Sequence, residues 1–375
     1  MKISSNFDGG NISVLSIDSM DDIRLEIRKD TLSEFSQWFY FRMQGAAGYP
    51  CSVKIMNAGD TFEPDGWKDY NVVASYDRLN WFRVPTSFNG KILSFDHTPQ
   101  FNSVFYAYFV PFSYEQHLDM IHTAQISPLC VIESLGNTVQ GRDIDLLTIG
   151  DPGEDKKKIW FISRQHPGET MASWFMEGLI DRLLDENDAV SRKLLRKAVF
   201  YVVPNINVDG SVLGNLRVNA AGKNLNREWA KPSRSESPEV FHVLTKMEET
   251  GVDLNLDIHG DEALPYNFAS SIDGIPAFDN RLKNLQDKFL TSWEKVNPDF
   301  QTEHGYKKDE PGKANLNICS KQIAQKFNCL SLTIEMPFKD NKNLPNPATG
   351  WSPERSAIFG ESVLDAILAI VDNLR

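Results

Sequence analysis

A histidine and a glutamate stand three residues apart in the turn His166-Pro-Gly-Glu169. The apolar run at 158–163 before this turn predicts a buried strand, and the apolar spacing at 171–180 after it predicts a helix. Both polar side chains therefore follow the carboxyl end of a strand, which is where open α/β sheets bind ligands. An imidazole nitrogen and a carboxylate oxygen are both ligands of zinc. Such a pair also occurs by chance in surface turns, so its interpretation depends on what else reaches the same sheet edge.

Residues 253–260 bring a third candidate ligand to that edge. Alternation along this strand puts the leucine and isoleucine side chains on one face, and Asp257 and His259 on the other. A lone histidine at a strand end is usually structural. As a partner of His166 and Glu169, however, His259 would complete a zinc site. Asp257 shares its face and could orient a neighbouring group.

Two more segments carry polar side chains that invite a functional interpretation. The last buried strand of the sequence contains Glu335, and a carboxylate is costly to bury without a partner or a task. The Gly- and Asn-rich loop at 214–229 contains Arg217, Asn226 and Arg227. Taken alone, this loop is a solvated surface segment with incidental charge.

The chain divides into two parts of different pattern. Residues 1–112 contain short strands rich in aromatic and β-branched side chains, with turns such as Asn89-Gly90, and this predicts an N-terminal antiparallel β-sandwich domain. Residues 113–375 begin with a helix and a hairpin and, from Lys158 onward, alternate strands with helices, which predicts an α/β domain. The predicted strands are 23–28, 37–42, 52–56, 91–95, 103–110, 129–134, 143–149, 158–163, 198–203, 253–260 and 330–337. The predicted helices are 114–123, 171–180, 238–250, 279–295, 314–327 and 353–373.

The composition is that of an ordinary globular protein. Of its residues, 41% are apolar and 24% are charged. The length of 375 residues exceeds that of most domains with a single hydrophobic core. A net charge of −12 argues against a broad nucleic-acid surface. The four cysteines lack Cys-x-x-Cys spacing, so we expect reduced core thiols. With no apolar leader and no apolar run of membrane length, the sequence predicts a cytoplasmic protein without a membrane segment.

The order of these motifs resembles that of the zinc metallocarboxypeptidases. The motifs are His166-Pro-Gly-Glu169, Arg217, Asn226-Arg227, Asp257-Ile-His259-Gly and Thr333-Ile-Glu335. They look most like the cytosolic branch of that family, whose members carry a β-sandwich before the catalytic domain. The segments Gln37-Trp-Phe-Tyr-Phe and Tyr108-Phe-Val-Pro-Phe also look like that sandwich, so the resemblance spans nearly the whole chain. It implies an α/β/α catalytic domain with a mixed sheet at 113–375, behind the sandwich at 1–112.

The resemblance also implies catalytic roles. His166, Glu169 and His259 would bind one Zn²⁺ per catalytic site and leave its fourth position to water, as catalytic zinc sites do. Glu335 would be the general base that takes a proton from this water and passes it to the leaving amine. Arg217 would stabilise the oxyanion of the tetrahedral intermediate.

The implied substrate is the C-terminus of a peptide or protein, cleaved at a peptide or isopeptide bond. Asn226 and Arg227 would hold the terminal carboxylate, and Tyr306 would be the tyrosine that closes over the substrate. Animal members of the cytosolic branch use a basic residue to recognise the acidic side chain that they remove. Lys313 and Lys321 are the candidates here, so the resemblance implies a preference for acidic C-terminal residues.

Two other interpretations stay open at this stage. A zinc amidohydrolase acting on N-acyl amino acids would share the His-x-x-Glu…His ligands and an Asn-Arg pair, although the front sandwich and Thr333-Ile-Glu335 favour the carboxypeptidase. A zinc-bearing peptide-binding module without turnover would not need Glu335 or Arg217. We expect no nucleic-acid or membrane partner, and the sequence leaves the partner of the sandwich, the natural substrate and the oligomeric state undetermined.

Overall fold

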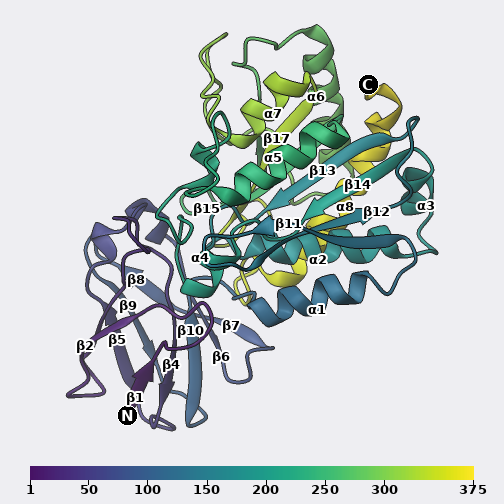
Figure 1. Ribbon diagram of the computed structural model, residues 1–375. Coiled ribbons are helices and arrows are strands. Elements are labelled where there is room, and N and C mark those ends of the chain that lie inside the picture. The colour runs from purple at the N-terminus through teal and green to yellow at the C-terminus, as the bar shows by residue number, and fades with distance from the viewer.

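Two five-stranded sheets form the N-terminal part of the computed structural model, which describes all 375 residues. The strands are β1 (Lys2–Ser4), β2 (Ser13–Ser16), β3 (Ile23–Glu26), β4 (Tyr40–Gln44), β5 (Cys51–Ile55), β6 (Val72–Ser75), β7 (Trp81–Val84), β8 (Thr86–Phe88), β9 (Leu93–His97) and β10 (Ser103–Ala107). The sheet orders are β1-β4-β10-β6-β7 and β2-β3-β5-β9-β8, and only β3 and β5 pair in parallel. Tyr106 of one sheet lies against Phe95 of the other, with ring centroids 5.1 Å apart. The predicted β-sandwich is confirmed (Figure 1).

The rest of the chain is built on one mixed sheet of order β11-β12-β14-β13-β15-β17-β16. Its strands are β11 (Cys130–Asn137), β12 (Asp143–Ile149), β13 (Lys157–Ser163), β14 (Ala198–Val203), β15 (Leu254–Asp261), β16 (Phe268–Ser270) and β17 (Leu330–Pro337). The four central strands run parallel, and every residue of β14, β15 and β17 is buried. Strands that are buried along their whole length occur where helices cover both faces of a sheet.

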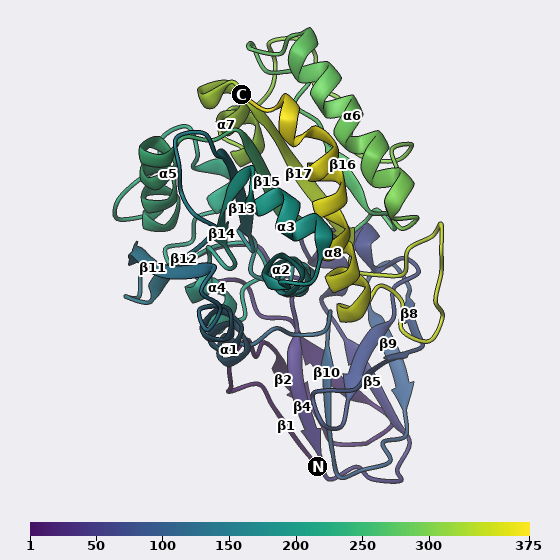
Figure 2. The same ribbon diagram turned by 90° about the vertical axis from the view of Figure 1, so that its right-hand side faces the viewer.

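Helices cover both faces of this sheet (Figure 2). They are α1 (Tyr114–Ala124), α2 (Met171–Leu184), α3 (Ala189–Leu195), α4 (Val208–Leu213), α5 (Pro238–Thr250), α6 (Asn280–Val296), α7 (Cys319–Phe327) and α8 (Pro353–Ile370). Ile159 and Phe161 of β13 belong to the same core cluster as α2 and α8, whereas Trp160 and Ile162 belong to a second cluster with α5 and α7. The α/β/α arrangement is therefore confirmed. None of the helices is both long and apolar enough to span a bilayer.

The junction between the sandwich and the mixed sheet is itself part of the core. Tyr108 stacks on Phe338, with ring centroids 4.3 Å apart. Arg83 donates hydrogen bonds to the backbone carbonyls of Phe338, Thr349 and Trp351. The two parts therefore share one continuous hydrophobic cluster, and the chain termini lie at opposite ends of the molecule (Figures 1 and 2).

One helix starts later than the sequence pattern predicts. The apolar spacing predicts a helix from residue 314, but α7 begins at Cys319. The Asn315 side chain accepts a hydrogen bond from the Asn317 backbone, which favours a turn over a helix in this segment. The first N–H of α7, at Cys319, is capped at 2.9 Å by Oδ1 of Asn226, a residue distant in sequence. The start of α7 is therefore set by a tertiary contact.

Candidate active site

The carboxyl ends of three adjacent strands, β13, β15 and β17, carry the predicted ligands and the predicted base. The turn that holds His166 and Glu169 follows β13 directly. In the parallel ladder between β15 and β17, His259 stands opposite Glu335. Paired residues of neighbouring strands direct their side chains to the same face of a sheet. This register therefore brings His259 and Glu335 to one place.

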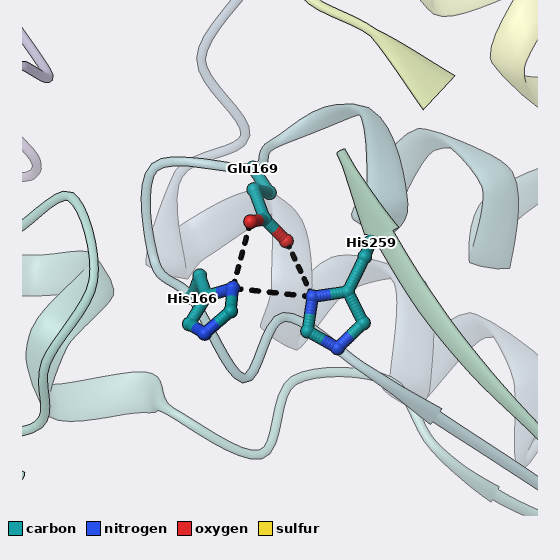
Figure 3. A group of neighbouring side chains, drawn as sticks. All are labelled: His166, Glu169 and His259. Carbon is teal, nitrogen blue, oxygen red and sulfur yellow. Dashed lines mark hydrogen bonds and ion pairs between the residues drawn. The ribbon is translucent and has the colours of Figure 1, made fainter. Parts of the chain in front are cut away.

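The three predicted ligands converge on one point (Figure 3). Nδ1 of His166 lies 2.7 Å from Oε1 of Glu169, Nδ1 of His259 lies 2.7 Å from Oε2 of Glu169, and the two Nδ1 atoms are 3.2 Å apart. All three side chains are buried. Ligands of tetrahedral zinc at about 2.0–2.2 Å lie about 3.3–3.6 Å from one another. The donor set of two imidazoles and one carboxylate therefore fits a zinc ion in its chemistry, and a small outward shift of the three atoms would bring them to this spacing.

Each imidazole has a partner on the nitrogen that faces away from this cluster. Nε2 of His259 lies 3.0 Å from Oδ2 of Asp257, as the shared strand face predicts, and Nε2 of His166 lies 3.0 Å from Oδ1 of Asn224. Gln165 donates to Oδ2 of Asp257 at 2.7 Å. Carboxylate and amide partners of this kind fix the orientation of metal-binding histidines.

The turn itself is held by a residue that the sequence does not single out. Arg164 has a left-handed backbone with φ of +64° and is buried. Its guanidinium donates to the carbonyl of Pro167 at 2.8 Å and to the hydroxyl of Ser173 at 2.9 Å. A strained residue of this type costs about 1–3 kcal/mol and persists only where its surroundings impose it. Arg164 therefore fixes the shape of the turn that presents His166 and Glu169.

The charges around the ligands keep one imidazole neutral and the carboxylate ionised. Burial, and then the charge of Arg217, lower the pKa of His166 to about 4. Burial alone would raise the pKa of Glu169, but the two histidines lower it well below its usual range. Burial opposes protonation of His259, yet the carboxylates of Asp257 and Glu169 raise its pKa well above the usual range. The carboxylates of Asp257 and Glu169 therefore favour a positive charge at this point of the site.

A cavity of about 340 Å³ lies beside this cluster. All eight residues chosen from the sequence line it: His166, Glu169, Arg217, Asn226, Arg227, His259, Tyr306 and Glu335. The hydroxyl of Tyr306 donates to Oδ2 of Asp261 at 2.5 Å and lies 3.3 Å from Oε1 of Glu335. Lys321 also lines the cavity, whereas Lys313 is exposed and does not.

Glu335 is buried at the cavity wall, and its Oε2 has no partner in the protein. Burial raises the pKa of Glu335 well above its usual range; His259 lowers it, and Glu169, Asp261 and Glu262 raise it. A cation held between His166, Glu169 and His259 would lower the pKa of the neighbouring Glu335 carboxyl and so favour its ionised form, which a general base needs.

Comparison with known families agrees with this geometry. The family model described as Zinc carboxypeptidase matches residues 114–359, and the model described as Cytosolic carboxypeptidase N-terminal domain matches residues 3–109. The chain belongs to the zinc carboxypeptidases. This carboxypeptidase is therefore a peptide-bond hydrolase that acts on C-termini, and the family implies zinc as its metal. The match favours this activity over the amidohydrolase and the binding module.

Three relatives illustrate the similarity of the carboxypeptidase to known proteins. The metallo-carboxypeptidase from Burkholderia cenocepacia is 50% identical, with a TM-score of 0.97 and 99% of each chain covered. The metallo-carboxypeptidase from Pseudomonas aeruginosa, solved in complex with (2-guanidinoethylmercapto)succinic acid, is 43% identical, with a TM-score of 0.97 and both chains fully covered. Cytosolic carboxypeptidase 6 of Mus musculus is 30% identical over 291 residues, which are 70% of this chain and 53% of the mouse protein. The chain thus spans about half the length of this mouse relative.

The cavity of the carboxypeptidase also includes residues that sequence reasoning missed. Phe62 and Glu63 reach it from the N-terminal sandwich, and Asp261 and Glu262 reach it from the end of β15. The acidic pair follows His259-Gly directly, so its position at a strand end was a usable signal. Nothing in the local pattern of the sandwich indicates that Phe62 faces a site formed by residues more than a hundred positions away.

Proposed function

We propose that the carboxypeptidase removes one C-terminal residue at a time, preferring an acidic one, through eight of the residues that line the cavity, namely His166, Glu169, Arg217, Asn226, Arg227, His259, Tyr306 and Glu335. The observation that carries this proposal is their convergence. Eight side chains chosen from scattered sequence motifs line a single cavity of about 340 Å³.

We also propose that residues 1–112 and 113–375 form two domains. We further propose that the chain works in the cytoplasm, since all four cysteines are buried and unpaired.

The proposed chemistry divides the work among the metal ligands, Glu335 and Arg217. His166, Glu169 and His259 hold one zinc ion, which when bound supplies Lewis acidity to the scissile carbonyl and acidifies water. Glu335 takes a proton from the attacking water and passes it to the leaving amine. Arg217 compensates the negative charge that develops on the carbonyl oxygen.

The substrate's terminal carboxylate is assigned to Arg227 and Asn226. Burial lowers the pKa of the Arg227 guanidinium, and the nearby charge of Arg217 lowers it further. Two guanidinium groups that line one cavity and repel each other favour an anion beside them, because the anion offsets their repulsion. Tyr306 stands across the cavity with its hydroxyl near Glu335, where it can close over a bound peptide.

The proposed acidic preference rests on Lys321. Its ammonium is buried in the cavity wall and donates to the carbonyl of Ser271 and to Oδ2 of Asp309, the latter at 2.7 Å. These two bonds leave its third N–H free for a substrate carboxylate, next to the Thr333 and Ser270 residues that also line the cavity. The compound bound to the Pseudomonas aeruginosa relative is a succinic acid that also carries a guanidino group. It therefore supports a carboxylate-binding cavity but does not favour an acidic over a basic side chain.

The test is cleavage of peptides that differ only at the C-terminus by the zinc-loaded protein. Amidation of the terminus should abolish cleavage, because Arg227 and Asn226 then lose their charged partner. Arg227→Ala should lower kcat/KM for the free acid by roughly 10- to 150-fold, the effect of one charged contact. The matched control is Arg234→Ala, which removes an exposed arginine outside the cavity and should leave kcat/KM unchanged.

Specificity is measured with peptides ending in Glu, Lys and Phe and with a γ-linked C-terminal Glu. We expect Glu to be removed fastest, and Lys321→Met to shrink its advantage over Phe, while Lys313→Met does not. Equal rates for all three termini, or faster removal of Lys, would reject the acidic preference. Cleavage of the amidated peptide at the rate of the free acid would reject the assignment of Arg227 and Asn226. Cleavage of the γ-linked substrate decides whether isopeptide bonds are accepted.

A further inference from the structure

The segment that carries Arg217 lies against the N-terminal sandwich. Nδ2 of Asn11 donates to the carbonyl of Gly214 at 2.9 Å. The backbone N–H of Thr31 donates to Oδ1 of Asn215 at 3.1 Å. Residues 214–218 are therefore held by hydrogen bonds to a part of the chain almost two hundred positions earlier.

A buried carboxylate of the sandwich holds the backbone on both sides of Arg217. Oδ1 of Asp30 accepts the N–H of Leu216 at 2.7 Å, and Oδ2 accepts the N–H groups of Arg217 at 2.7 Å and of Val218 at 3.2 Å. Burial raises the pKa of Asp30 to about 6, while the three N–H groups and the charge of Arg217 act against this rise. The carbonyl of Leu216 accepts the N–H of Gly168 at 2.8 Å, which links the same segment to the metal-binding turn.

Two aromatic rings of the sandwich hold the other end of the side chain. The guanidinium carbon of Arg217 lies 4.3 Å from the ring centroid of Phe62 and 5.6 Å from that of Phe35. The two rings meet edge to face at 5.2 Å, so each supports the other. A guanidinium held by ring faces keeps its N–H groups available for a ligand, whereas an ion pair with a carboxylate would occupy them.

We propose that Asp30 and Phe62 are positioning residues for Arg217, so that the N-terminal sandwich completes the active site. This inference rests on the proposed function, in which Arg217 faces the developing oxyanion. A donor to an oxyanion stabilises the transition state only if it stands within hydrogen-bond distance of where the charge forms. An arginine side chain has many rotamers, and fixing its backbone at one end and its planar face at the other selects one of them.

The test compares single and double variants of the zinc-loaded full-length protein on one peptide substrate. Arg217→Ala should lower kcat by about 10²- to 10³-fold, as loss of an oxyanion donor does. Asp30→Asn and Phe62→Leu should each lower kcat by about 10- to 100-fold, with KM and zinc content unchanged. Asp8→Asn is the matched control, since Asp8 also accepts a backbone N–H across the junction, from Tyr114 at 2.7 Å, and makes no hydrogen bond or ion pair with Arg217.

The decisive readout is the double variant. If Asp30 and Phe62 act through Arg217, adding either substitution to Arg217→Ala should produce no further loss of kcat. Provided that Arg217→Ala is impaired, three outcomes would overturn the proposal. They are losses of kcat that multiply in the double variants, a loss of zinc from either single variant, and a wild-type kcat in both Asp30→Asn and Phe62→Leu. If Asp30→Asn does not fold, Phe62→Leu still tests the proposal. Phe62 is 37% exposed, and replacing its apolar ring leaves no buried polar group without a hydrogen-bond partner. A wild-type kcat in Arg217→Ala would instead reject the oxyanion role in the proposed function.

Discussion

Replacing Glu239 by glutamine should make the protein more stable above neutral pH and leave it unchanged in acid. Glu239 lies in the first turn of α5 and is fully buried. Its Oε2 accepts one hydrogen bond at 3.1 Å from Asn219, and its Oε1 has no partner. Burial raises the pKa of Glu239 from its ordinary 4.5 to about 7. Glutamine has the same shape, can still accept from Asn219, and never ionises.

The size of the effect follows from linkage between protonation and folding. The folded state holds the proton up to about pH 7, whereas the unfolded state releases it near 4.5, so the folded state binds more protons between these values. Rising pH therefore lowers the free energy of unfolding of the wild type through this window, and the loss is complete above pH 7. A difference of about 2.5 in pKa corresponds to about 3 kcal/mol. Glu239→Gln removes this loss.

The assay is urea unfolding of wild type and variant, followed by tryptophan fluorescence between pH 4.5 and 8.5. The gap in unfolding free energy should open from near zero at pH 4.5 to about 3 kcal/mol at pH 8. Glu249→Gln, on the exposed side of the same helix, is the control and should change stability by less than about 0.5 kcal/mol. A gap that does not change with pH, or a variant less stable than wild type at pH 8, would refute the reasoning.

Two further predictions concern the metal and the base. His259→Ala should lose most of the bound zinc, because the variant lacks one of the three proposed ligands. Metal analysis that finds full occupancy would remove His259 from the proposed ligand set. Glu335→Gln should keep the zinc and the fold but lower kcat by about 10²- to 10⁴-fold, since an amide cannot accept the proton. Turnover near the wild-type rate in that variant would exclude Glu335 as the base.

The placement of the candidate site could be predicted because it depends on local signals. Buried strands are marked by apolar runs, and a polar residue at the carboxyl end of such a run marks a sheet edge. These signals predict that His166, Glu169, His259 and Glu335 meet at one edge of the sheet, and the folded chain holds all four beside one cavity.

What the sequence could not predict depends on contacts between distant segments. The start of α7 is decided by Asn226, which caps the helix from a separate loop. Asp30 and Phe62 act on Arg217 from more than 150 positions away, and nothing in their own neighbourhood indicates this. Lys321 and Lys313 are equally basic in the sequence, and only the packing of α7 against the sheet shows which one lines the cavity.

The junction between the two parts also determines the order in which the chain can finish folding. Arg83 donates hydrogen bonds to backbone carbonyls that lie 255, 266 and 268 positions later in the chain. Tyr108 stacks on the ring of Phe338. During synthesis, the strands of the sandwich leave the ribosome well before the partner of Tyr108 emerges. Contacts between residues so far apart in sequence form slowly, and the uncovered surface of the sandwich is aromatic. We therefore expect nascent chains to aggregate more readily until Phe338 and the residues after it have been synthesised. The segment from β17 through α8 thus has two roles: it contains Glu335, and it packs against the sandwich, which is synthesised much earlier.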